Sequence, residues 1–288
     1  MRIITVQFDY PGQERYKRLM SAFRNSIQVH EPNAKLVEVV LDPPMDLLAS
    51  ARKRSFASNT AKLEVWVRQL QESDEDALLV DCDMLMVNPV SDVWEQDFDI
   101  AYTFREEGGA PKLPVYEIQD GRKVRVRAKP HPGLRFEKRT TGRGAPVTLM
   151  PDFTYKKAGR RWPPYNGGVL FVRPNERSLE FFNTMRDVNN QMMVDKSMHD
   201  PYRRAYAGIN QAAFGYMMEN HQGVCSMLQL PCSTWNACDN TWLDYGDHVR
   251  MIHIKSALRR YCLRDHPIPD EYLFLVEMWE RYETMEAV

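Results

Sequence analysis

The first hundred residues alternate short apolar runs with segments in which apolar side chains recur every three or four positions. Such runs are typical of buried strands, and the three-to-four spacing is typical of helices that pack on a sheet. One helix should carry the apolar residues from Tyr16 to Ile27, and a second should begin at the capping pair Asn59-Thr60. Alternating strands and helices predict an α/β domain with a mostly parallel central sheet, whose ligands lie at the carboxyl ends of the strands. The expected strands are 2–8, 35–41, 77–80 and 100–104.

The second half of the chain continues this pattern after a change of composition. A strand is expected over 165–172, opened by an Asn-Gly-Gly turn, and a further apolar run covers 249–254. Helical spacing marks three segments, around 179–188, 206–217 and 272–282. Because no internal repeat or interdomain linker is visible, we expect one domain spanning 1–288.

The segment 105–161 interrupts this domain and is rich in Gly, Pro and cations. It holds 15 Lys and Arg residues against 6 Asp and Glu residues. Apolar stretches on either side of Asp120-Gly121 predict a β-hairpin, and 129–161 is expected to be loop. An insertion of this kind is a solvated loop, a lid over a ligand, or a docking site for an anionic acceptor such as DNA, RNA or an acidic glycan.

Composition limits the classes of function that remain. Apolar residues make up 43% of the 288, and 38 Lys and Arg balance 39 Asp and Glu, which argues against a disordered chain and against a generally basic polyanion binder. No apolar run approaches bilayer length and the N-terminal run meets Asp9, so we expect neither membrane insertion nor a signal peptide. Five cysteines without a C-x2-C pair favour reduced thiols in a cytoplasmic protein. A homo-oligomer is compatible with this composition.

Three D-x-D patterns occur, and only one follows a buried strand directly. Asp81 and Asp83 come straight after the run 77–80, where two carboxylates can share one hard cation that also takes phosphate oxygens. Taken alone, the pair fits a metal site and a structural acidic turn equally well. The other two patterns, 74–76 and 97–99, are expected to be solvated turns.

Two further features favour the metal-diphosphate interpretation. His253 lies in an apolar run beside Lys255, Arg259 and other cations. A lone histidine there is more often a core residue, yet an imidazole with two carboxylates suits Mn2+, and Lys and Arg bind phosphate oxygens. The second feature, Asn166-Gly167-Gly168, is either a simple tight turn or a place where a ligand approaches bare backbone, with an amide free to bond a sugar hydroxyl. Four aromatic residues beside predicted loops are either core anchors or stacking surfaces for sugars or bases: Trp162, Tyr165, Trp235 and Trp242.

Together these segments resemble GT-A-fold glycosyltransferases, most of all glycosyltransferase family 8, which includes the glycogenins and bacterial galactosyltransferases. The resemblance covers nearly the whole chain except the basic insertion. It rests on an N-terminal strand followed, in the family's order, by 61–63 (AKL), 77–87 (ALLVDCDMLMV), 165–174 (YNGGVLFVRP), 209–214 (INQAAF), 230–236 (LPCSTWN) and 251–256 (MIHIKS).

The resemblance implies a role for each matching residue. Asp81 and Asp83 would bind Mn2+ or Mg2+ with His253 as third ligand, and Asp81 would also lie near the nucleotide ribose. Asn166, with Gly167 and Gly168, would face the donor sugar. The remaining matches are donor-binding or catalytic residues: Lys62, Asn210, Gln211, Lys255 and Arg259.

Two positions depart from the family's pattern. Asn210 stands where a carboxylate is usual, which leaves no side-chain nucleophile there. In the diphosphate segment His-x-x-Gly-x-x-Lys, Ser256 replaces the glycine and Arg259 replaces the lysine, so the positive charge is retained.

The implied reaction is transfer of a sugar from a nucleoside diphosphate sugar, most often a UDP-sugar, with retention at the anomeric carbon, as in a hexosyltransferase. The metal, Lys255 and Arg259 would stabilise the negative charge that develops on the departing diphosphate. The acceptor stays open between glycan, protein and nucleic acid. A protein that binds the nucleotide sugar without turnover is the alternative, because Asn210 departs from the pattern and fold alone does not establish activity. A nucleotidyltransferase is disfavoured, since the chain has no Gly-rich phosphate loop.

Overall fold

The computed structural model describes residues 1–9, 14–43, 51–104, 165–206, 209–221, 224–238, 241–242 and 246–285, and the backbone of four short strands within 105–161. Its centre is a six-stranded sheet in the order β11-β5-β10-β3-β1-β2. Five of these strands are parallel to one another, and β10 runs antiparallel between β5 and β3. The strands are β1 (Arg2–Phe8), β2 (Lys35–Leu41), β3 (Ala77–Val80), β5 (Ile100–Phe104), β10 (Tyr165–Val172) and β11 (Met227–Pro231).

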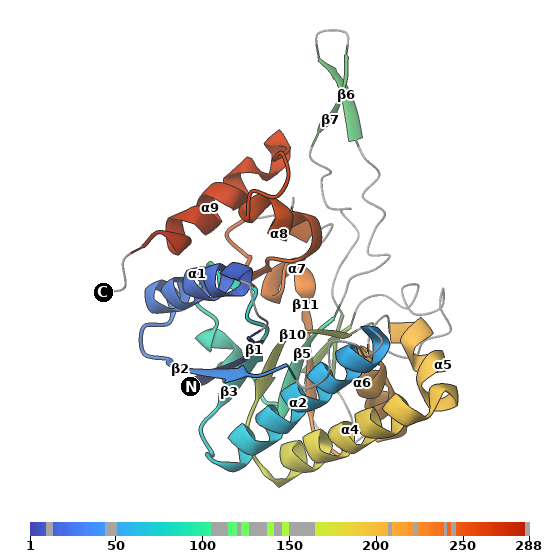
Figure 1. The fold of residues 1–288 in the computed structure, drawn as a ribbon. Helices are drawn as coiled ribbons and strands as arrows, with labels where there is room; N and C mark the ends of the chain where they lie inside the picture. Colours follow the sequence, from blue (N-terminus) through green and yellow to red (C-terminus); the bar gives the residue numbers. More distant parts are fainter. Residues whose placement is uncertain are drawn as a thin grey trace.

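Helices cover both faces of the sheet (Figure 1). One face carries α2 (Ala51–Gln71), α4 (Glu176–Val194), α5 (Lys196–Tyr206) and α6 (Ile209–Asn220). The other carries α1 (Glu14–His30), with α8 (Ser256–Cys262) and α9 (Leu273–Glu283) beyond it. Short elements complete the described chain: the 3-10 helices η1 (Ser91–Glu95) and η3 (Asp270–Tyr272), and α7 (Cys232–Trp235).

The apolar periodicities explain this layering. Alternate residues of β1 enter different cores, with Ile4 and Val6 packed under α2, α4 and α6, and Ile3 packed under α1. Both faces of β3 and β10 are buried, as their continuous apolar runs indicate. A third cluster joins α1 to α8 and α9 through Leu19, Leu258 and Trp279.

A separate two-stranded antiparallel sheet lies beyond the end of β3. It pairs β4 (Met84–Met86) with β12 (Met251–His253), so that His253 is opposite Met84. This pairing joins the segment that follows β3 to a segment near the C-terminus.

The structure corrects three expectations about local elements. Helix α2 begins at Ala51, so Asn59 and Thr60 lie inside it and do not cap it. The Asn-Gly-Gly segment is part of β10, where the register with β5 shifts between Asn166 and Leu170. The helix expected over 206–217 is confirmed as α6 from Ile209 onward, whereas Tyr206 is the last residue of α5.

A fourth correction concerns Asp99, which is 3% exposed and not a solvated turn residue. Its Oδ1 accepts hydrogen bonds from Asn175 and Arg177, each at 2.8 Å, and its Oδ2 accepts from the amide (2.6 Å) and hydroxyl (2.9 Å) of Ser226. Burial alone would raise the pKa of Asp99, but these hydrogen bonds and the charge of Arg177 hold it below its ordinary value. The hydrogen bonds of Asp99 thus link the starts of β5, β11 and α4.

The basic insertion is described only as the backbone of two antiparallel pairs. The expected hairpin is confirmed as β6 (Val115–Gln119) with β7 (Arg122–Val126). Inside the segment expected to be loop, β8 (Glu137–Thr140) pairs with β9 (Pro146–Leu149). The rest of 105–161 lies outside the described residues, and so does Trp162. The acceptor hypotheses for this segment therefore stay predictions.

Two expectations from composition can be compared with the described part of the chain. All five cysteines are buried and free, as predicted. None of the described helices is long and apolar enough to cross a membrane.

Candidate functional site

Two aspartates follow β3 at the carboxyl edge of the central sheet. The amide of Asp81 donates to the carbonyl of Gly168 in the neighbouring strand (3.1 Å), which extends the contact between β3 and β10 by one residue. Asp83 immediately precedes β4 and is 6% exposed. The predicted pair therefore lies where ligands of α/β folds bind.

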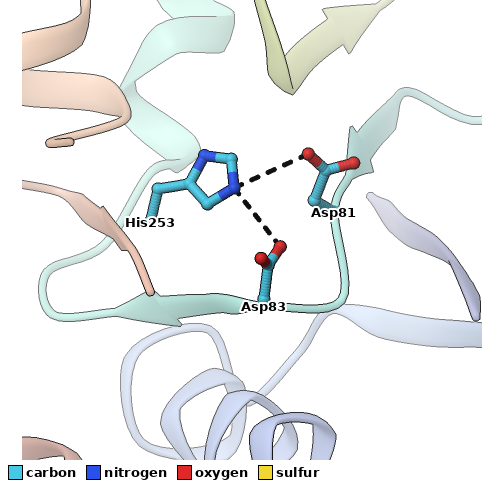
Figure 2. A group of neighbouring side chains, drawn as sticks. All are labelled: Asp81, Asp83 and His253. Carbon is cyan, nitrogen blue, oxygen red and sulfur yellow. Dashed lines mark ion pairs between the residues drawn. The ribbon is translucent and has the colours of Figure 1, made fainter. Parts of the chain in front are cut away.

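His253 reaches the same point from β12. The amide of Ile254 donates to the carbonyl of Asp83 (2.7 Å), and the Nε2 atom of His253 lies 3.3 Å from Oδ1 of Asp83 and 3.7 Å from Oδ2 of Asp81. Figure 2 shows the three side chains turned toward one another. One ligand atom from each lies within 4.8 Å of the others, so the three residues form a single cluster, called the triad below.

Each carboxylate of the triad also pairs with a cation of the chain. Lys62 of α2 contacts Asp81, and Arg259 of α8 contacts Asp83. Burial alone would raise the pKa of Asp83, but the adjacent His253 and Arg259 outweigh burial and hold this pKa far below its ordinary value. Asp83 is therefore a carboxylate across the physiological pH range.

Lys62 and Arg259 each contact an aromatic residue, which we did not predict from the sequence. The Nζ atom of Lys62 lies 4.3 Å from the centroid of the Trp66 ring. Arg259 donates to the hydroxyl of Tyr16 (3.2 Å) and to the carbonyl of Ile254 (3.2 Å). The i, i+4 spacing of Lys62 and Trp66 was a detectable signal for the first contact, whereas Tyr16 meets Arg259 only through tertiary packing.

Two neighbours fix the orientation of the His253 ring. The Nδ1 atom of His253 lies 3.2 Å from Oδ1 of Asn236, which leaves Nε2 facing the carboxylates. A Cβ atom on Gly168 would lie 2.8 Å from Nδ1 and 2.9 Å from Cε1 of His253, closer than any real contact. Gly168 is thus required for close packing against the imidazole. The sequence did not lead us to predict a role for Asn236, although this residue lies in one of the segments that carry the resemblance.

The Asn-Gly-Gly segment links the triad to α6. Gly168 contacts His253, and a Cβ atom on Gly167 would lie 2.8 Å from the side-chain amide nitrogen of Asn210. Gln211 is half-buried in the first turn of α6. Asn166 is 3% exposed; its amide nitrogen donates to the sulfur of Cys238 (3.3 Å), and its Oδ1 atom accepts from the amide of Gly168 (3.3 Å).

The backbone just after His253 adopts a conformation that favours glycine. Ser256 has φ 49°, in the left-handed region that glycine adopts without steric cost. The half-buried Lys255 precedes it at the start of α8. Of the two expected cations, Arg259 contacts Asp83, and Lys255 lies two residues after His253 in the chain.

The other aromatic candidates are mainly structural. Tyr165 and Trp242 are 1% and 3% exposed. Trp235 is half-buried and packs edge-on against Phe171 with the ring centroids 5.5 Å apart. Tyr165 and Trp242 are therefore core residues with no exposed ring face.

The donor set fits a divalent cation. Two carboxylates and a neutral imidazole nitrogen are ligands that Mn2+ accepts, and carboxylates also suit Mg2+. The thiol of Cys82 lies between the two aspartates in sequence, but burial and the two carboxylates raise its pKa, so it stays protonated and is a poor ligand.

No family model and no curated protein matches this chain in sequence. Solved structures match its fold. A glycosyltransferase involved in the glycosylation of the major capsid of PBCV-1 superposes over 99% of this chain and 100% of its own, with a TM-score of 0.50 and 13% identity. The chain shares its fold with glycosyltransferases. GlyE of Streptococcus pneumoniae TIGR4 gives a TM-score of 0.51 at 13% identity over 99% of this chain and 62% of its own. The bifunctional glycosyltransferase WbbM gives 0.52 at 11% over 98% and 49%.

These matches confirm the predicted fold class, an α/β GT-A fold with a mostly parallel central sheet. This chain spans the whole of the capsid glycosyltransferase but only about half of WbbM. At such low identities the likeness concerns the fold and carries no donor or acceptor with it.

Proposed function

We propose that this protein is a metal-dependent glycosyltransferase that uses a nucleoside diphosphate sugar as donor. The observation that carries the proposal is the triad, in which Asp81, Asp83 and His253 meet at the carboxyl edge of the sheet in a chain with a glycosyltransferase fold.

The three triad side chains would hold Mn2+ or Mg2+. The bound cation would neutralise part of the charge of the donor diphosphate. Lys62 and Arg259 contact Oδ1 of Asp81 and Oδ2 of Asp83, whereas Oδ2 of Asp81 and Oδ1 of Asp83 face His253. The two cations therefore leave the facing oxygens open but reduce the negative charge that attracts a metal ion. We therefore expect weak binding of the metal alone and stronger binding of metal and nucleotide together, because a diphosphate gives both side chains new partners.

The chain's own cations would assist departure of the diphosphate. Negative charge grows on the leaving group as the bond from the anomeric carbon to the phosphate oxygen breaks. Arg259 at the triad and Lys255 at the start of α8 are the cations that would lie near this charge. Stabilisation of this kind removes the need for a protonated acid on the leaving group.

The finer assignment rests on the sequence resemblance to glycosyltransferase family 8. It favours a UDP-sugar donor and retention at the anomeric carbon. Asn210 and Gln211 would then lie beside the reacting sugar, and Asn210 cannot form a covalent ester with the sugar as a carboxylate could. Retention would therefore proceed by attack of the acceptor on the face that the diphosphate leaves.

Thermal unfolding with nucleotides tests the proposal. A ligand that binds only the folded state at 100 times its Kd adds about 2.7 kcal/mol to the free energy of unfolding. We expect stabilisation by UDP with Mn2+ that exceeds the sum of the shifts with UDP alone and Mn2+ alone. The absence of a shift with UDP, ADP, GDP and CDP, each with Mn2+ or Mg2+, would contradict the proposal.

Asn210 favours a second candidate, a protein that binds the nucleotide sugar without turnover. Hydrolysis separates the two functions, because transferases slowly pass the sugar to water when no acceptor is present. Release of UDP from a stabilising UDP-sugar, lost in Asp83→Asn, would identify a transferase. Stabilisation without release over many hours would identify a binding protein.

A further inference from the structure

The strand β2 forms one edge of the central sheet (Figure 1), and within the described residues it pairs with β1 alone. The strand contains no proline, and its register with β1 is continuous from Lys35 to Leu41. Val40, near its end, is 57% exposed. Proline, a bulge or a covering segment usually protects the edge of a sheet from pairing with another strand. The edge of β2 is therefore open to a partner strand.

The backbone contacts with β1 show which residues of β2 face outward. The Lys35 amide donates to the carbonyl of Met1 (3.1 Å), and the Leu41 carbonyl accepts from the amide of Asp9 (2.9 Å). The N–H and C=O groups of successive residues in a strand point to opposite edges, so the odd-numbered residues of β2 face β1 and the even-numbered ones face outward. The outward-facing residues are Leu36, Glu38 and Val40.

These three residues are spaced to pair with a second copy of themselves. If two β2 strands lie antiparallel with Glu38 opposite the same residue of the second copy, Leu36 lies opposite Val40. Each pair then exchanges two hydrogen bonds, and every outward N–H group meets an outward C=O group. A register shifted by two residues would leave one of the three residues without a partner.

The same register brings the exposed valine to a groove. Leu36, Glu38 and Val40 lie on one face of the strand. This is the face that α1 covers, since Leu36 packs with residues of α1, and Arg24 of α1 pairs with Glu38. Between α1 and β2 lies an open groove of about 380 Å³, whose apolar lining residues are Ile27, Pro32, Ala34 and Leu36. Because Val40 of a second copy would lie opposite Leu36, its side chain would cover this groove.

The charges at the centre of the pairing are compatible with it. Two Glu38 side chains would face each other, but each already accepts two hydrogen bonds from Arg24, from Nε to Oε1 and from a terminal nitrogen to Oε2, both at 2.8 Å. The centre of the interface would therefore hold two cations and two anions. The arginines offset the repulsion between the glutamates, because bidentate pairs of this kind are charge-assisted.

We propose that β2 is the self-association edge of this protein, at which two copies join antiparallel through Leu36, Glu38 and Val40 into one continuous sheet. The two copies use the same surface, so pairing closes the edge of both and association through β2 stops at a dimer. The inference is independent of the proposed function, because it uses no residue of the triad.

Sedimentation equilibrium of the full chain over the micromolar range tests the dimer. Val40→Pro removes an outward N–H group but no hydrogen bond to β1, so the fold should be retained while the dissociation constant rises at least about 10-fold. Val40→Lys should weaken the dimer as strongly, because it places a charge against the apolar groove. Val194→Lys is the matched control, since Val194 is 80% exposed at the end of α4, and this variant should dimerise as wild type does.

Glu38→Cys tests the register. Hydrogen-bonded partners in an antiparallel pair have Cα atoms about 5.5 Å apart, which is within the range of a disulfide. Mild oxidation should therefore link two copies of this variant, and the five native cysteines should not contribute because all are buried. Lys35→Cys is the control, since Lys35 is also exposed on β2 but lies opposite Leu41 in this register, far from its own copy.

Each outcome decides for or against the proposal. Wild type that stays monomeric throughout the micromolar range overturns it. A dimer that is unaffected by Val40→Lys, or weakened equally by Val194→Lys, has its interface elsewhere and also overturns it. If circular dichroism shows that Val40→Pro does not fold, Val40→Lys decides alone. Glu38→Cys that cross-links no more than Lys35→Cys overturns the antiparallel pairing centred on Glu38.

Discussion

His253 lies against Asp83 because β12 pairs with β4, and the distance from Nε2 of His253 to Oδ1 of Asp83 is 3.3 Å. The Ile254 amide donates to the carbonyl of Asp83 (2.7 Å), so the contact is fixed by backbone and not by two flexible side chains. A cation that binds here therefore meets ligands that are already in place, which lowers the entropy cost of binding.

Asp83→Asn should abolish the additional stabilisation that Mn2+ gives in the presence of UDP. The change removes a charged ligand but keeps the size of the side chain. The measured quantity is the Tm difference with and without Mn2+ at fixed UDP, which does not depend on any change in basal stability. Asp74→Asn is the control, because Asp74 is exposed and belongs to another D-x-D pattern. A metal-dependent shift that survives in Asp83→Asn would show that the ligand set is wrong.

Gly168→Ala should displace the imidazole of His253. The new Cβ atom would lie 2.8 Å from Nδ1, so the ring has to move and the metal-dependent shift should fall at least several-fold. We expect a destabilisation of about 1–3 kcal/mol, typical of overpacking a filled core. Gly246→Ala is the control, since its Cβ would meet only the exposed His248, at 3.2 Å. Equal metal responses in the two variants would refute the role given to Gly168.

Asp99→Asn should destabilise the fold by about 2–3 kcal/mol at neutral pH, because charge-assisted hydrogen bonds to several donors are lost. The pKa of Asp99 is lowered in the folded state, so its stabilising contribution is present above the unfolded pKa of about 4 and disappears as pH falls through the folded value. The difference between variant and wild type in chemical unfolding should therefore shrink as the pH falls below about 4.

Asp97→Asn provides the matched control for that experiment. The Asp97 side chain is 85% exposed, and its substitution should change stability by less than about 0.5 kcal/mol. If Asp99→Asn has a pH-independent effect, the folded protein does not hold Asp99 ionised at low pH.

Ser256→Gly should stabilise the protein by about 0.5–1 kcal/mol. A serine at φ 49° pays a steric cost that glycine does not, and the gain is reduced by the greater flexibility of glycine in the unfolded chain. Urea unfolding of Ser256→Gly and Ala257→Gly separates the relief of strain from the flexibility that glycine adds. Ala257 lies in the same helix, and its replacement should destabilise the protein by a similar amount. A loss of stability in Ser256→Gly would contradict the strain at this residue.

Much of the fold followed from local patterns. The strands at 2–8, 35–41, 77–80, 100–104 and 165–172 coincide with β1, β2, β3, β5 and β10, because runs of buried β-branched and apolar residues are recognisable without partners. The predicted start of α2 was wrong, because residues that often cap a helix, such as Asn59 and Thr60, are also tolerated inside one. The antiparallel direction of β10 has no signature of its own in the sequence.

In the candidate site, too, some features could be predicted from the sequence and others depended on the fold. The sequence by itself determined the chemical inventory: two aspartates after a buried strand, a histidine among cations, and a glycine pair before an apolar run. Only the tertiary structure decided that Asp83 and His253 share one point, that Asp99 is buried and bonded, and that the Asn166 amide faces inward. The physical reason is that strand and helix periodicities act between neighbours in sequence, whereas convergence depends on strand pairing and packing between segments that the chain keeps far apart until it folds.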